Sequence, residues 1–172
     1  VGQNESLITL AFQSNQLTSI DIIGNPNIES LNCAQNQLSE LNIDHLSNLN
    51  ALSCALNQLT SLDVSQNGAL NNLVCSYNAL TYLNVQNGSN ASFVTFNATE
   101  NPDLTCIQVD DADNANAGAP PYGIWQKDAT ARYSENCSNV APIITSQEEI
   151  NVDEDTEFEI SLDHLIIDRK ST

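Results

Sequence analysis

Residues 17–37 read LTSIDIIGNPNIESLNCAQNQ, and most of the chain repeats this unit. Three further copies follow without a gap: LSELNIDHLSNLNALSCALNQ (38–58), LTSLDVSQNGALNNLVCSYNA (59–79) and the longer LTYLNVQNGSNASFVTFNATENPD (80–103). The leucines that begin the units lie 21 residues apart, at Leu17, Leu38, Leu59 and Leu80. A half unit precedes these copies and a partial unit follows them. A short fixed period of this kind predicts a stack of similar coils that share one core.

Apolar residues occupy fixed columns within each unit. The first half places them as in Ile20 and Ile22, and the second half as in Leu31 and Cys33. Each pair is two positions apart, which is the period of a β-strand. The stretches between the pairs hold Asn, Ser, Gly and Gln without helical periodicity. We therefore predict a mainly β, flattened, right-handed solenoid with short parallel strands on both sides and little helix.

An asparagine closes the second half of every unit, at Asn15, Asn36, Asn57, Asn78 and Asn101. An amide that points inward at a turn can bond backbone groups that the coil leaves unpaired, so these five residues should form a ladder. The resulting pattern LxxLxCxxNxL, over residues 5–110, resembles the leucine-rich repeat. The resemblance implies a right-handed leucine-rich repeat solenoid of the type found in secreted bacterial surface proteins. We assign residues 1–110 to this array.

The five cysteines fall into two groups. Cys33, Cys54 and Cys75 share one apolar column. We predict buried free thiols there, because parallel side chains neither converge on a metal nor suit a disulfide. Cys106 and Cys137 lie outside that column and bracket a segment with Trp125 and two other aromatic residues, Tyr122 and Tyr133.

The bracketed segment has the features of a cap for the exposed end of a solenoid. It resembles the C-terminal flanks of secreted bacterial leucine-rich repeat proteins. We predict a Cys106–Cys137 disulfide that ties down a cap at residues 111–138. The alternative is two unrelated thiols. A disulfide would imply an oxidising, extracytoplasmic setting, either secreted or at the cell surface.

Residues 139–172 differ in composition from the repeats and hold nine of the 22 acidic residues. The alternation in EFEISL indicates a strand, and the segment resembles the first strands of cadherin-like or immunoglobulin-like modules. We assign it to a linker and a partial β-sandwich-like fragment. Asp153, Glu154 and Asp155 are weak calcium candidates, since carboxylates suit hard cations, and the alternative is a solvated acidic run. An exposed strand edge here could support self-association.

The net charge of −18 sets limits on function. Residues 1–126 contain no Lys or Arg, which argues against nucleic acid and against anionic membrane surfaces as partners. The longest apolar runs are too short to span a bilayer. His45 and His164 are isolated, and acid pairs such as Asp110 and Asp111 are typical of solvated turns. No recognised catalytic motif is present, so we predict no enzyme activity and no cofactor beyond the calcium candidate.

The family resemblance implies that strand residues between the buried ones form a binding face. Three columns fit this description: Ala11, Asn32, Ser53, Val74 and Asn97; Gln13, Ala34, Ala55, Ser76 and Thr99; Ser14, Gln35, Leu56, Tyr77 and Glu100. We predict Tyr77, Leu56 and Val74 as anchors, with Asn32, Ser53 and Asn97 beside them. The alternative is that these are ordinary solvent-facing residues.

These columns predict a non-catalytic extracellular adhesion or binding module for a protein or a glycan. The competing hypothesis is a structural spacer that presents other domains. A hydroxyl column, Thr18, Ser39, Thr60, Thr81 and Thr105, suggests ice binding as a further alternative. Ordinary turn chemistry accounts for that column equally, because such hydroxyls satisfy local backbone groups.

Overall fold

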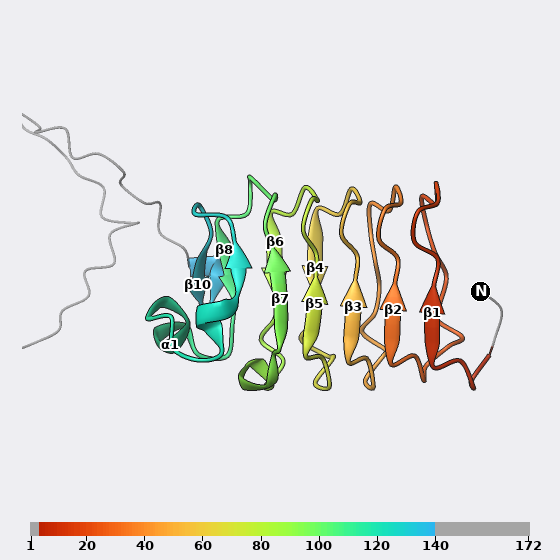
Figure 1. The fold of residues 1–172 in the computed structure, drawn as a ribbon, viewed down its shortest axis with the longest axis horizontal. Helices are drawn as coiled ribbons and strands as arrows, with labels where there is room; N and C mark the ends of the chain where they lie inside the picture. Colours follow the sequence, from red (N-terminus) through yellow and green to blue (C-terminus); the bar gives the residue numbers. More distant parts are fainter. Residues whose placement is uncertain (1–3, 140–172) are drawn as a thin grey trace, which may run out of the picture. The chain divides into compact units, whose positions relative to one another are not determined.

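A computed structural model describes residues 4–139 of the chain, which divides into two compact units, Val1–Ser138 and Asn139–Thr172. Within the first unit the chain winds as a stack of coils, with a strand on each side of most coils (Figure 1). Sheet A contains, in order, β1 (Thr9–Ala11), β2 (Ser30–Asn32), β3 (Ala51–Ser53), β5 (Asn72–Val74), β7 (Thr95–Ala98) and β9 (Gln126–Lys127). Sheet B contains β10 (Arg132–Ser134), β8 (Cys106–Gln108), β6 (Tyr82–Asn84) and β4 (Ser61–Asp63).

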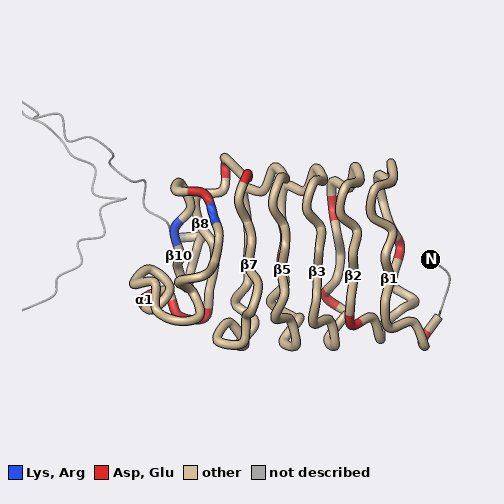
Figure 2. Tube along the Cα trace, viewed as in Figure 1, with Lys and Arg blue, Asp and Glu red and all other residues tan. Residues whose placement is uncertain are grey.

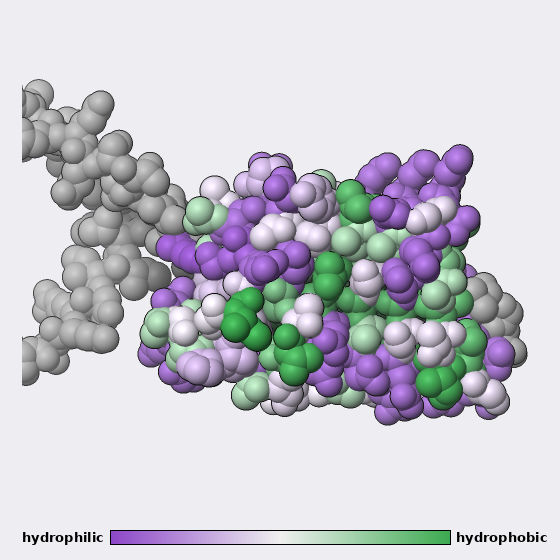
Figure 3. All heavy atoms as spheres, in the orientation of Figure 1, coloured by the Kyte–Doolittle hydropathy of each residue, from purple (hydrophilic) through white to green (hydrophobic). Residues whose placement is uncertain are grey.

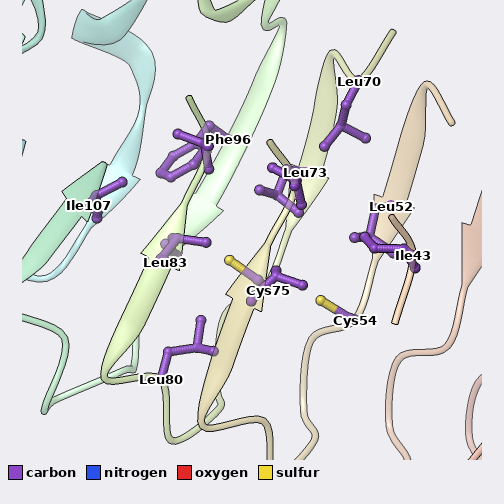
Figure 4. Packing of buried hydrophobic residues seen from close by; sticks show 14 of the residues in the cluster. Ile43, Leu52, Cys54, Leu70, Leu73, Cys75, Leu80, Leu83, Phe96 and Ile107 are labelled. Atoms are coloured by element: carbon purple, nitrogen blue, oxygen red, sulfur yellow. The ribbon is translucent and has the colours of Figure 1, made fainter. Parts of the chain in front are cut away.

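All strand pairs are parallel, and their register follows the repeat. In sheet A, Leu31 pairs with Leu52 and Leu52 with Leu73, each 21 positions further along the chain. The paired leucines belong to the buried core, and Figure 4 shows two of them, Leu52 and Leu73, among the apolar side chains between the two sheets. Among residues 4–139, helix is confined to α1 (Ala112–Asn116) and three 3-10 turns, η1 (Asn90–Ser92), η2 (Tyr122–Ile124) and η3 (Cys137–Asn139). The predicted mainly β parallel solenoid is confirmed.

The C-terminal end of the stack is closed by aromatic residues. The indole of Trp125 stacks on the last phenylalanine of sheet A, Phe96, with ring centroids 4.2 Å apart, and also contacts Phe93. Tyr122 and Tyr133 pack around the same indole. These rings cover apolar surface that the final coil would otherwise expose. The sequence-based prediction of an aromatic cap is therefore confirmed.

The predicted disulfide is also confirmed. Cys106, at the start of β8, is bonded to Cys137, with Cα atoms 5.8 Å apart. The bond encloses the whole cap, since the two cysteines are 31 residues apart. Cross-linking a loop of this length stabilises the folded chain mainly by restricting the unfolded one.

Several predictions concern residues outside the described part of the chain. The β-sandwich-like fragment, the calcium candidates Asp153, Glu154 and Asp155, His164 and the strand edge for self-association all lie beyond residue 139. The division of the chain at residues 110 and 138 stays a prediction. Within residues 4–139, no helix is long and apolar enough to cross a bilayer.

Candidate functional site

The outer face of sheet A is formed by two columns of small residues. Because the leucine at the centre of each strand points inward, the residues on either side of it point outward. One of these columns was predicted, and Asn32, Ser53, Val74 and Asn97 are half-buried in it. The other was not recognised in the sequence, although period-2 alternation about each leucine would have identified it. Its members are Thr9, Ser30, Ala51, Asn72 and Thr95.

The predicted anchors Leu56 and Tyr77 do not lie on strands. Both occupy the turn after a sheet A strand, with left-handed backbone φ values of 56° and 55°. Ser14, Gln35 and Glu100 have the same conformation in their own coils, so the turn belongs to the repeat. Bulky residues rarely adopt a positive φ, because the Cβ atom approaches the carbonyl oxygen. The prediction of a flat strand-borne column is therefore corrected to a ridge of turns along the edge of sheet A.

The second predicted column, which runs from Gln13 to Thr99, was expected to be exposed, and this expectation was wrong for two of its members. Ala55 and Ser76 are buried, at 9% and 5% exposure, whereas Leu56 and Tyr77 next to them are 44% and 53% exposed. The chain bends at the left-handed residue, and the preceding position folds under the turn. In these two coils the buried position holds a small residue, Ala55 or Ser76. The exposed apolar area thus lies on the turn ridge.

Sheet A is electrically neutral over most of its width. The strands from β1 to β7 contain no charged residue. Among the described residues, Lys127 and Arg132 are the basic ones, and both lie in the cap (Figure 2). Figure 3 shows this face as small apolar patches separated by polar side chains. Two exposed apolar residues that the repeat did not predict, Val94 and Ile124, flank the start of β7 and β9 and are 64% and 63% exposed.

The asparagine ladder fixes the turn that carries Leu56 and Tyr77. The Nδ2 group of Asn57 donates to the carbonyls of Cys33 and Cys54 at 3.0 and 3.1 Å, and its Oδ1 accepts from the amide of Leu38 at 3.0 Å. Asn36, Asn78 and Asn101 make the equivalent bonds in their coils. The side chain of Asn15 bonds only to the carbonyls of Phe12 and Gln13 in its own turn, and the residue is exposed. Each coil is thereby joined to the coil before it.

A second set of buried asparagines, absent from the sequence predictions, lies at the opposite turn. Asn25, Asn67 and Asn90 are fully buried there. Asn67 donates to the carbonyls of Ile43 and Leu46, both at 2.9 Å. The coil between Asn25 and Asn67 has Leu46 at the equivalent position. In that coil the Nε2 atom of His45 lies 3.1 Å from the carbonyl oxygen of Ile22, the counterpart of the Ile43 carbonyl.

This contact gives His45 a structural role. The imidazole replaces the missing asparagine amide and joins its coil to the preceding one. The sequence showed that no other unit has a histidine at the position of His45, but it did not predict that the imidazole replaces an asparagine amide.

The three column cysteines are free and fully buried, as predicted. Figure 4 shows the sulfur atoms of Cys54 and Cys75 directed into the space between the sheets. Burial raises the pKa of Cys33 and Cys75 to about 12 and raises the pKa of Cys54 well above its ordinary value. Thiols in this state are poor nucleophiles and metal ligands, because both roles need the thiolate.

The acid pair Asp110 and Asp111 forms hydrogen bonds that hold the chain. The two carboxylate oxygens of Asp110 accept from the amides of Gly88 and Asn90, each at 2.9 Å. Asp111 caps α1 by accepting from the amide of Asn114 at 2.9 Å. Asp110 is thus not the merely solvated residue that we expected. Residues 4–139 contain no group of three or more His, Cys, Asp or Glu side chains that could hold a metal ion.

The hydroxyl column lies on the sheet B side and is exposed throughout. Thr81 donates its amide proton to the carbonyl of Thr60 at 2.9 Å, and its hydroxyl lies 3.3 Å from the same oxygen. Thr81 thus satisfies a local backbone group, as ordinary turn chemistry predicts for this column.

Comparison with known proteins gives a likeness to a solved structure. No family model matches the chain, and no curated protein matches it. Among solved structures, the chain is similar to the functional domain of InlJ from Listeria monocytogenes, which includes a cysteine ladder. The identity is 22%, the TM-score is 0.47, and the match covers 77% of this chain and 37% of the InlJ chain. The chain therefore spans little more than a third of that structure.

Proposed function

We propose that the protein is a non-catalytic extracellular binding module that recognises a protein or a glycan through the edge of sheet A formed by Leu56 and Tyr77. One observation carries the proposal. Two large apolar side chains occupy consecutive left-handed turns and are 44% and 53% exposed. Neither core packing nor backbone preference favours Leu or Tyr at these positions. Their exposure on a rigid turn offers contact area with little loss of side-chain entropy on binding.

The surroundings support a partner held by shape and hydrogen bonds. Half-buried Val74, Asn32, Ser53 and Asn97 present small polar and apolar groups beside the ridge. Their neutrality predicts association that depends weakly on salt. The disulfide supports an oxidising location, either secreted or at the cell surface. If the module only presents other domains, no ligand will select this face.

The test begins with ligands captured on a glycan array and by pull-down from the native habitat. Replacement Tyr77→Ala should weaken binding of such a ligand by about 1–3 kcal/mol. The variant Tyr77→Asn removes the ring but suits a positive φ, so binding lost in both variants cannot come from the backbone. Tyr82→Ala is the matched control, because Tyr82 is 39% exposed on sheet B. Equal affinity of all three variants and the parent chain would exclude this face.

A further inference from the structure

Sheet B does not extend over the whole stack. Its strands are β10, β8, β6 and β4, so β4 is an edge strand. The two preceding coils pass the same side of the molecule without forming a strand. On this side of the described part of the chain, the backbone bonds between those coils lie next to the start of each unit, where the amide of Gln37 donates to the carbonyl of Leu17 and that of Gln58 to Leu38. Within residues 4–139, the backbone groups of Glu40, Leu41 and Asn42 form no hydrogen bond.

A hollow of about 400 Å³ lies beside β4, where the strand pairing of sheet B ends. It is lined by two residues of the first coil, four of the second and two of β4: Ser19, Ile20, Glu40, Leu41, Asn42, Asp44, Ser61 and Asp63. A smaller hollow of about 150 Å³ adjoins it and shares Ile20 and Asn42 with it. The opening therefore spans three coils.

The floor of this hollow is part of the apolar core. Leu41 is only partly buried, whereas Leu62 and Leu83, its counterparts in the next two coils, are 1% and 0% exposed. Position in the stack does not explain the difference. On sheet A the second coil is already covered, since Leu31 is 1% exposed. Leu41 is uncovered because the strand-like packing on its side is missing.

The rim of the hollow is acidic. Glu40, Asp44 and Asp63 line it, and the carboxylates of Glu40 and Asp44 accept no hydrogen bond from any described residue. Residues 1–126 contain no Lys or Arg that could neutralise them. Carboxylates of one sign that line one hollow, without a neighbouring Lys or Arg, favour a cation there, and added salt should weaken that preference.

We propose that this hollow, the β4 groove, binds an extended peptide segment of a partner protein that carries Lys or Arg side chains. An extended backbone supplies both the donors and the acceptors that Glu40, Leu41, Asn42 and the free edge of β4 leave unused. Strand addition at a sheet edge uses these main-chain bonds for affinity and alternate side chains for selectivity. Apolar side chains would cover Leu41, and the basic ones would reach Glu40 and Asp44.

Other occupants fit the groove less well. A polyamine would satisfy the carboxylates, but it has no carbonyl groups to accept from the free amides. Residues 140–172 of the chain itself carry nine acidic residues against two basic ones, and like charge opposes their entry. The groove is separate from the Leu56 and Tyr77 ridge and does not depend on the function proposed for that ridge.

The probe is a fluorescein-labelled peptide, acetyl-Thr-Lys-Val-Lys-Thr-Lys-amide, titrated into the full chain and followed by fluorescence anisotropy. We expect saturable binding, at least about fivefold weaker for the peptide with Glu in place of Lys, and similarly weakened by N-methylation of alternate backbone amides. The double variant Glu40→Gln, Asp44→Asn should bind about fivefold less tightly. Glu29→Gln, Asp103→Asn is the matched control with the same net charge and should bind like the parent chain.

Four results would overturn the proposal. They are the absence of saturable binding, equal binding of the Lys and Glu peptides, unchanged binding after N-methylation, and competition by spermidine at the concentration of the peptide. Amide NMR shifts locate the contact in each case. Changes at Leu41, Asn42 and Ser61 support the groove, whereas changes confined to Leu56 and Tyr77 assign the peptide to the other site. Tyr77→Ala should leave peptide affinity unchanged, which separates this test from that of the proposed function.

Discussion

The two sides of the same coils differ in how completely they are built. Sheet A runs unbroken from β1 to β9, whereas sheet B begins only at β4. Both sides carry the same apolar columns, and Ser19–Asp21 matches Ser61–Asp63 in all but one aliphatic residue. Local sequence is therefore insufficient to form a strand. A parallel strand in such a stack also requires a neighbouring row with which to share its hydrogen bonds.

The turns beside the two sheets indicate where the difference arises. The turn after sheet A has an asparagine in every coil, from Asn15 to Asn101. The turn after sheet B lacks one in the second coil, where Leu46 is buried and His45 supplies a single contact. The missing amide belongs to the second of the two coils that form no strand on their sheet B side, the coil that adjoins β4. We infer that inward amides hold successive coils in register, and that their loss loosens the adjoining rows.

The largest expected effect compares the two sides directly. Leu52→Asp places a charge in the closed core of sheet A and should cost more than about 4 kcal/mol, enough to unfold several coils together. Leu41→Asp places the charge on the floor of the open β4 groove. It should cost about half as much, because water reaches the carboxylate. Urea unfolding followed by circular dichroism and by the fluorescence of Trp125 measures both variants. Equal losses would mean that the two sides are closed to the same extent.

The second expected effect compares the two asparagine turns. Asn57→Ala leaves the buried amide of Leu38 without its acceptor and removes one of the two side-chain donors to each of the carbonyls of Cys33 and Cys54, so it should cost about 3 kcal/mol. Asn67→Ala should cost only about 1–2 kcal/mol. Its Oδ1 atom has no partner, and both carbonyls that it bonds also accept a backbone amide, from Leu46 and Leu49. Chemical denaturation of the two variants gives the comparison, and a larger loss for Asn67→Ala would contradict our account of the turns.

The sequence predicted those features that depend on regular spacing. The repeated apolar columns predicted the parallel register and the buried thiols. The two cysteines that lie outside the cysteine column predicted the Cys106–Cys137 bond. The left-handed turn was not predicted, because Ser, Gln, Leu, Tyr and Glu at that position carry no common signal for a positive φ. The second asparagine set was missed because Leu46 interrupts its spacing. The β4 groove depends on hydrogen bonds between coils, which no single unit encodes.

The smallest expected effect concerns a chemical difference between the sheets. Sheet A carries Cys33, Cys54 and Cys75 in the column where the sheet B side has Ile and Val, such as Ile43 and Val64. Burial raises the pKa of Cys75 from 9.0 to about 12. A folded-state pKa above the unfolded value means that the neutral thiol stabilises the fold below about pH 9, and that this contribution is lost as the pH rises toward 12.

Between about pH 8 and about pH 10 each such thiol should therefore lower the free energy of unfolding by about 1.4 kcal/mol. Cys75→Val makes this row resemble its sheet B counterpart, so the variant should lose about 1.4 kcal/mol less than the parent chain over the same range. The difference between the two proteins cancels the titration of tyrosines, which they share. Urea unfolding at both pH values gives the slopes, and intact mass verifies that the Cys106–Cys137 bond has not exchanged with a free thiol. Parallel pH slopes would show that the Cys75 thiol ionises as readily in the folded chain as in the unfolded one, and that sheet A is open to water there in the way that sheet B is open at Leu41.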